Sequence, residues 1–66
     1  MLVQRVFAHR IIYCGKEYRN HVAELASDGT VVLFPFEREI AMTTFYSGTI
    51  ELTVTSEPRF EIRQIC

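Results

Sequence analysis

Apolar and polar residues alternate with a period of two along much of this chain, which is the spacing of β-strands. The clearest alternation runs through residues 49–55, where Ile50, Leu52 and Val54 share one face while threonines and a glutamate occupy the other. Residues 60–63 show the same pattern, with apolar and charged side chains in turn. Both segments are predicted to be strands that bury one face and expose the other.

Three further strands are predicted in the first half of the chain, over residues 2–13, 18–26 and 30–36. The first has apolar residues on both faces, which is typical of a strand that is buried on different sides along its length or bends at a bulge. The third contains Val31–Phe34, which is apolar on both faces, so this strand is predicted to be central or at an interface. Pro35 ends its ladder or marks an edge, because proline has no N–H to donate.

Turn-forming residues separate the predicted strands. Asp28 and Gly29 lie between two apolar runs and predict a hairpin, since aspartate hydrogen-bonds the turn backbone and glycine adopts the left-handed conformation. Gly15 marks a turn between the first two strands. Ser47 and Gly48 are predicted to break the chain or to form a bulge.

Residues 37–46 have two possible conformations. Phe36, Ile40 and Thr44 have helical spacing, and Glu37–Glu39 could begin a short helix just after Pro35. The β-prone run Thr43–Tyr46 and the small number of residues available for a helix favour a loop or a single turn. We expect a loop or turn that leads into a strand near Thr43.

Five or six short strands at a spacing of about ten residues predict one all-β domain over residues 1–66, folded as a small antiparallel barrel or sandwich. The chain has 66 residues, of which 48% are hydrophobic. A domain this short buries only about 60% of the surface that its unfolded chain exposes, so the surplus of apolar side chains predicts a homodimer. The expected interface residues are aromatic or aliphatic: Val32, Phe34, Phe36, Phe45 and Tyr46.

The charged residues support two competing hypotheses. A net charge of −1 gives no long-range attraction for a phosphate backbone, so a nucleic-acid partner is not expected. Six of the seven cationic residues are nevertheless arginines, which suit interfaces and anion contacts. Arginines that are scattered and paired with glutamates would be structural. Arg5, Arg10 and Arg19 clustered beside Tyr13 or Tyr18 would instead form a surface for a small ligand or single-stranded nucleic acid.

No group of residues in the chain predicts catalysis or metal binding. His9, His21 and Cys14 lack the spacing of a metal site, and the cysteine has no adjacent base to activate it. The carboxylates of Glu37 and Glu39 point the same way on an extended chain, but nothing places them in a cleft. We therefore predict no catalytic residue, no metal site, no cofactor and no enzymatic activity.

The start of the chain and its cysteines bear on the compartment. Arg5, His9 and Arg10 interrupt the segment where a signal peptide needs a continuous apolar run. No apolar run approaches the roughly 20 residues of a membrane helix. These features predict a cytoplasmic protein with no membrane partner, in which Cys14 and Cys66 are reduced, and a disulfide between the two is the alternative.

Two segments of the chain resemble part of a known enzyme family. Residues 7–17 (FAHRIIYCGKE) and 21–32 (HVAELASDGTVV) are similar to the small β composite domain at the start of amidohydrolase-type enzymes, where a strand and a glycine turn lead into a hairpin of the form V-x-x-D-G-x-V. In that family the metal ligands begin with an H-x-H motif, which this chain lacks. The resemblance therefore implies a β accessory domain without catalytic residues, and the chain also resembles small bacterial β proteins.

These expectations together predict a non-enzymatic structural or protein-interaction module that acts through homodimerisation. The alternative is a module that binds a small ligand or single-stranded nucleic acid with its arginine and tyrosine side chains. The sequence names neither the ligand nor the protein partner.

Overall fold

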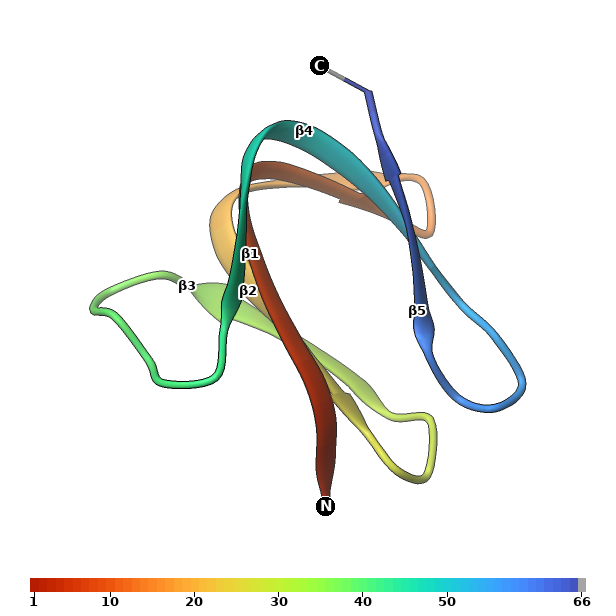
Figure 1. The fold of residues 1–66 in the computed structure, drawn as a ribbon. Helices are drawn as coiled ribbons and strands as arrows, with labels where there is room; N and C mark the ends of the chain where they lie inside the picture. Colours follow the sequence, from red (N-terminus) through yellow and green to blue (C-terminus); the bar gives the residue numbers. More distant parts are fainter. Residues whose placement is uncertain (66) are drawn as a thin grey trace.

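The alternating segments form five β-strands in the computed structural model, which describes residues 1–65. They make one sheet in the order β3-β2-β1-β4-β5 (Figure 1). The strands are β1 (Leu2–Tyr13), β2 (Lys16–Ala26), β3 (Val31–Pro35), β4 (Thr44–Val54) and β5 (Phe60–Gln64). Neighbouring strands are antiparallel except β1 and β4, which are parallel. The predicted all-β fold class is therefore confirmed.

The sheet differs from the predicted antiparallel barrel or sandwich because it is mixed and is not closed. The parallel pair arises where residues 36–43 carry the chain from β3, at one edge, across to β4 on the far side of β1. This crossover loop contains no helix, so the loop expected before Thr43 is confirmed. The first strand has its predicted bounds, whereas β2 begins two residues earlier than expected, at Lys16. β4 is also longer than expected, at 11 residues, because it continues through Ser47 and Gly48.

The three long strands bend together at one level of the sheet (Figure 1). The pairing of β1 with β2 and the pairing of β1 with β4 both skip His9. At the same level β4 forms a bulge, one of the two alternatives predicted at Ser47-Gly48, with Gly48 at φ 79°. Asn20 of β2 has φ 54°. Glycine adopts this conformation freely and asparagine tolerates it, so these residues allow the sheet to curl.

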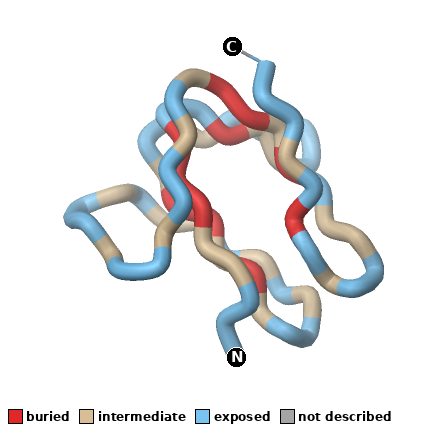
Figure 2. The backbone as a smooth tube through the Cα atoms, in the orientation of Figure 1, coloured by how far each residue is buried: buried red, intermediate tan, exposed pale blue. Residues whose placement is uncertain are grey.

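The curl gives the sheet an inner face, which holds the core, and an outer face. The buried segments follow the inside of the curve (Figure 2). The core is entirely apolar and comes from four strands: Val6, Ala8, Ile11, Ala23, Leu25, Ile50, Leu52 and Phe60. A short chain therefore encloses a core with one sheet, because the sheet wraps around its own side chains instead of packing on a second layer.

The two edges of the sheet are β3 and β5. Of the two positions predicted for Val31–Phe34, the central one is therefore excluded and the interface stays a prediction. Val32 keeps 49% of its surface exposed. At the other edge, the backbone N–H of Phe60 donates a hydrogen bond of 3.0 Å to Oε1 of Gln4, from β1. This bond ties the β5 edge to the start of the central strand.

Replacing Gln4 with alanine is expected to lower the free energy of unfolding by about 1–3 kcal/mol, because the Phe60 N–H loses its acceptor. Urea denaturation followed by circular dichroism measures the change. Gln64→Ala is the control, since Gln64 donates to the Ser47 carbonyl at 2.9 Å from an exposed position where water can replace it. That variant is expected to lose less than about 1 kcal/mol, and equal losses would contradict the role of Gln4.

The turn between β2 and β3 has the geometry that Asp28 and Gly29 predict. Gly29 has φ 90° and its N–H donates to the Ala26 carbonyl at 2.9 Å. The backbone N–H of Thr30 donates to Asp28 Oδ1 at 2.9 Å. Hydrogen bonds from the side chain and backbone of Thr30 hold the pKa of Asp28 below its ordinary value of 3.8.

This lowered pKa makes part of the stability depend on pH. Because the folded-state pKa lies below the unfolded value, the carboxylate stabilises the fold above pH 3.8, and that contribution is lost as the pH falls through the folded-state pKa. Asp28→Asn keeps an acceptor oxygen but does not titrate. It is expected to lose less stability than the wild type between about pH 5 and about pH 3, measured by urea denaturation. An unchanged pH dependence would contradict this assignment.

Candidate functional site

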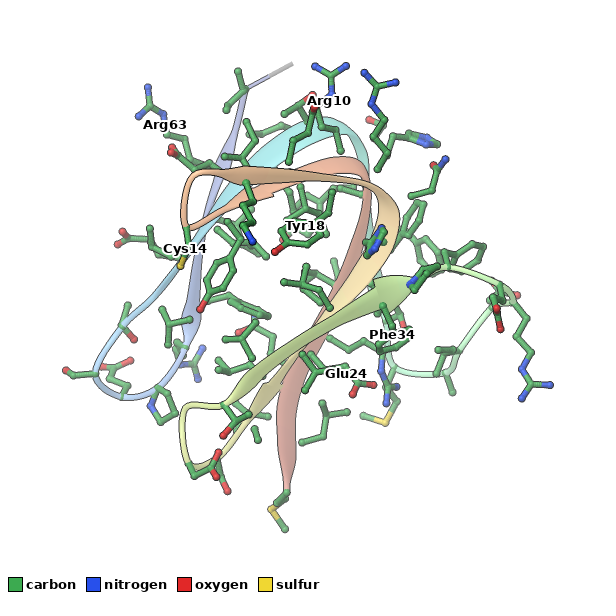
Figure 3. All side chains as sticks on the ribbon, turned by 180° about the vertical axis from the view of Figure 1, so that it is seen from behind. Arg10, Cys14, Tyr18, Glu24, Phe34 and Arg63 are labelled. Carbon is green, nitrogen blue, oxygen red and sulfur yellow. The ribbon has the colours of Figure 1, made fainter. Side chains whose placement is uncertain are left out.

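The predicted arginine and tyrosine surface is divided between the two faces of the sheet. Tyr13 and Tyr18 pack against the inner core, and Tyr18 lies within the curve (Figure 3). Arg10 and Arg19 are direct partners across β1 and β2 and point to the outer face, as the alternation along a strand requires. The structure therefore brings these two arginines together and separates them from both tyrosines.

The Tyr13 hydroxyl lies beside the thiol of Cys14. Burial and a hydrogen bond with the Cys14 side chain raise the pKa of Tyr13 above its ordinary value of 10.0. Its phenol therefore keeps its proton at neutral pH. Cys14 is exposed in the turn between β1 and β2, whereas Cys66 lies outside the described residues, so the reduced state of both thiols stays a prediction.

Most of the arginines pair with glutamates, as the structural hypothesis expects. Within residues 1–65, Arg19 and Arg38 form no ion pair. The other four arginines contact carboxylates at 2.5–3.8 Å: Arg5–Glu24, Arg10–Glu17, Arg59–Glu57 and Arg63–Glu51.

Arg5 holds the crossover loop against the outer face. Its Nε donates to Glu24 Oε2 at 2.8 Å, and its Nη1 donates to the carbonyl of Ala41 at 2.6 Å. The side chains of Arg5 and Glu24 are only 17% and 27% exposed, so water screens this pair less than the other three. Arg5 is therefore committed to the fold and is not available to a ligand.

Three phenylalanines form a cluster on the outer face, and one of them, Phe36, is the first residue of the crossover loop. Phe7 of β1 lies 4.7 Å from Phe36 and 5.4 Å from Phe45 between ring centroids. Phe36 and Phe45 meet edge to face at 6.1 Å. Phe7 is the buried member of the cluster, whereas Phe45 remains 48% exposed. The outer face thus has an apolar centre that is exposed in part.

Four of the five predicted interface residues share this outer face. Phe36 and Phe45 belong to the phenylalanine cluster. Val32 and Phe34 of β3 lie on the same side, because they pair with the β2 residues that themselves pair with Arg5 and Phe7. Tyr46 is the exception, since it packs against the inner core.

A shallow concavity of about 380 Å³ opens at the bend of the sheet. Six residues of three strands line it: His9, Arg10, Arg19, Asn20, Gly48 and Thr49. The two arginines stand directly opposite each other, which is unfavourable for like charges unless an anion lies between them. The arrangement can hold a negatively charged group, and its wall includes Thr49, a buried polar residue.

The sequence indicated only part of this concavity. Arg10 and Arg19 belong to the predicted binding surface, and Ser47-Gly48 predicted the bulge. His9, Asn20 and Thr49 were missed as lining residues. The position of Thr49 beside Arg10 depends on the parallel pairing of β1 with β4, which no local pattern predicts. A run of polar residues at Arg19-Asn20 inside a predicted strand was the available signal.

The histidines are engaged in local contacts. His21 Nδ1 donates to the Arg19 carbonyl at 2.8 Å, and the His21 ring lies 5.4 Å from that of Tyr18. The His9 ring packs edge-on to Phe7 at 5.6 Å. Among residues 1–65, no three His, Cys, Asp or Glu side chains group together in a way that could hold a metal ion.

No family model, curated protein or solved structure matches this chain. The resemblance to the composite domain of amidohydrolase-type enzymes therefore stays a prediction. Across the described residues, the structure has no helix with the length and apolar character needed to cross a membrane. A functional proposal for this chain therefore rests on the contacts and exposed surfaces of its own structure.

Replacing Arg5 with methionine is expected to lower the free energy of unfolding by about 1.5–3 kcal/mol, because charge-assisted hydrogen bonds to Glu24 and the loop are lost. Arg63→Met is the matched control. Arg63 lies 3.8 Å from Glu51 and its side chain is 81% exposed, so its loss is expected to cost under about 1 kcal/mol. Urea denaturation of both variants measures the two losses of unfolding free energy. Equal losses would contradict the role of Arg5 in holding the crossover loop.

Proposed function

We propose that this chain is a non-enzymatic protein-interaction module that forms a homodimer through the edge of β3. The observation that carries the proposal is an apolar edge strand whose outward backbone groups have no partner within residues 1–65. Such an edge offers a ready template for pairing with another strand.

The hydrogen bonds at the two ends of the β2–β3 ladder indicate which groups are free. Ala26 N–H donates to the Thr30 carbonyl at 2.9 Å, and Phe36 N–H donates to the Asn20 carbonyl at 2.8 Å. Hydrogen-bonded pairs alternate along an antiparallel ladder, so every second residue of β3 directs its backbone toward β2. Val31 and Leu33 belong to the other set of residues, whose N–H and C=O groups point away from β2 and out of the sheet.

The other edge is less suited to pairing. The Ile65 N–H donates to the Thr49 carbonyl, so by the same alternation Phe60 is one of the outward-directed residues of β5. Its N–H is already taken by Gln4. The exposed Glu61 and Arg63 also place charges along this strand, which is how natural sheets discourage edge-to-edge contacts. By contrast, residues 30–36 contain no charged residue.

Antiparallel pairing of two β3 strands is self-complementary, as a twofold dimer requires. It brings Val32 and Phe34 of both copies together on the outer face, beside the phenylalanine cluster. No like charges from β3 oppose this contact. Pro35 limits the length of the new ladder, because it has no N–H to contribute.

The alternative, a platform of arginine and tyrosine side chains for single-stranded nucleic acid, has less support. Such a platform needs aromatic rings beside the cations, whereas Tyr13 and Tyr18 pack on the inner face. Ion pairs with Glu24 and Glu17 also reduce the charge that Arg5 and Arg10 offer.

Light scattering behind a sizing column, over a dilution series, tests the dimer. The wild type is expected near twice 7.7 kDa, and Val32→Lys is expected to dissociate it, because a lysine on this edge is both charged and strongly hydrated. Val32 is 49% exposed, so the monomer should tolerate the change, and circular dichroism checks that it stays folded.

Ile65→Lys is the matched control. Ile65 has the same exposed fraction, 49%, but follows the opposite edge strand. It is expected to remain dimeric. A monomeric wild type at all concentrations, or a dimer that Ile65→Lys dissociates and Val32→Lys does not, would contradict the proposal.

A further inference from the structure

The concavity at the bend is a second surface, formed by residues other than those of the β3 edge. Arg10 and Arg19 form its cationic part, as direct partners on β1 and β2. Arg10 projects outward from the bend, away from the core (Figure 3). The neighbouring outer-face cation, Arg5, is held by Glu24 and the crossover loop and does not line the concavity.

The charges at this site are incompletely balanced. The Glu17 carboxylate contacts Nε of Arg10 at 2.5 Å. This contact leaves the two terminal nitrogens of the Arg10 guanidinium free to donate elsewhere. Arg19 has no ion pair within residues 1–65. Two guanidinium groups on facing positions therefore share one carboxylate, and the pair would gain from a second anion.

The interrupted strand pairing provides the space. Both ladders of β1 skip His9, and the flanking residues Asn20 and Gly48 have φ 54° and 79°. The rim thus carries an amide and an imidazole, while Thr49 adds a hydroxyl to the wall. Each of these groups can donate a hydrogen bond, and no carboxylate lines the concavity.

We propose that this concavity binds the phosphate group of a small molecule between Arg10 and Arg19. Two guanidinium groups from opposite strands offer more donors than the two oxygens of one carboxylate accept, whereas a phosphate group presents oxygens in several directions. A volume of about 380 Å³ leaves room for the rest of a small phosphate monoester. The proposal is independent of the dimer.

Amide chemical shifts of the ¹⁵N-labelled protein, followed during titration with inorganic phosphate at constant ionic strength, test this site. The wild type is expected to show saturable shifts centred on Arg10, Arg19 and Gly48. Arg19→Gln is expected to weaken binding at least about tenfold, the effect of one lost charge-assisted hydrogen bond. Arg38→Gln is the matched control, because Arg38 also lacks an ion pair within residues 1–65 but lies in the crossover loop.

A second variant tests the site by a gain of affinity. Glu17→Gln removes the carboxylate that competes for Arg10 and is expected to tighten phosphate binding several-fold, a result that loss of structure cannot mimic. Running the titration on Val32→Lys as well separates the two proposals, since phosphate binding should persist in the monomer.

Three results would overturn the assignment: no saturable shift, equal weakening by Arg19→Gln and Arg38→Gln, or no tightening by Glu17→Gln. A single-stranded oligonucleotide provides a further test. For an oligonucleotide that binds through this face, the slope of the logarithm of affinity against the logarithm of salt concentration reports the number of bound phosphates. A slope much steeper than about −0.7 means that several phosphates are bound together. That result would assign the face to a polyanion and contradict the small-molecule site.

Discussion

The bend at His9 is the constraint on which the rest of the structure depends. A flat sheet made from this chain would expose the apolar side chains of one whole face to water. Because both ladders of the central strand are interrupted at the same level, the three long strands curl and enclose those side chains. The left-handed backbone of Asn20 and Gly48 makes the curl sterically possible.

The curl also makes the two edges of the sheet unequal. It lets Gln4 of the central strand meet the backbone of β5, so that one edge has an internal hydrogen-bond partner and charged side chains. No such partner meets β3 within residues 1–65, and that strand is apolar. An open sheet of this kind buries its core without a second layer, at the cost of one exposed edge.

Arginine side chains serve two purposes in this small domain. Arg5 has a structural role, because its guanidinium donates one hydrogen bond to Glu24 of β2 and another to the Ala41 carbonyl of the crossover loop. Arg10 and Arg19 face each other where the backbone opens at the bend, and only one carboxylate balances them. The same residue type thus stabilises the outer face at one level and leaves it cationic at another.

Local patterns in the sequence determined the fold class and most of the elements. The first strand has the bounds that were predicted for it, and Asp28-Gly29 specified its turn, because both signals act between residues close in the chain. The bulge at Ser47-Gly48 was predicted for the same reason. Of the interface set, Val32, Phe34, Phe36 and Phe45 do share one face. Tyr46 does not, because it follows Phe45 directly in β4 and adjacent strand residues point to opposite faces.

The tertiary structure alone decided the strand order, the parallel pair and the position of β3 at an edge. These depend on contacts between residues far apart in the chain, such as Gln4 with Phe60 and Arg5 with Ala41, which no local period encodes. The sequence also left two arrangements of the arginines open, paired with glutamates or clustered beside Tyr13 or Tyr18. The folded sheet places Tyr13 and Tyr18 against the inner core and Arg10 and Arg19 on the outer face. The register between strands decides which residues share a face, and the pattern of a single strand does not specify that register.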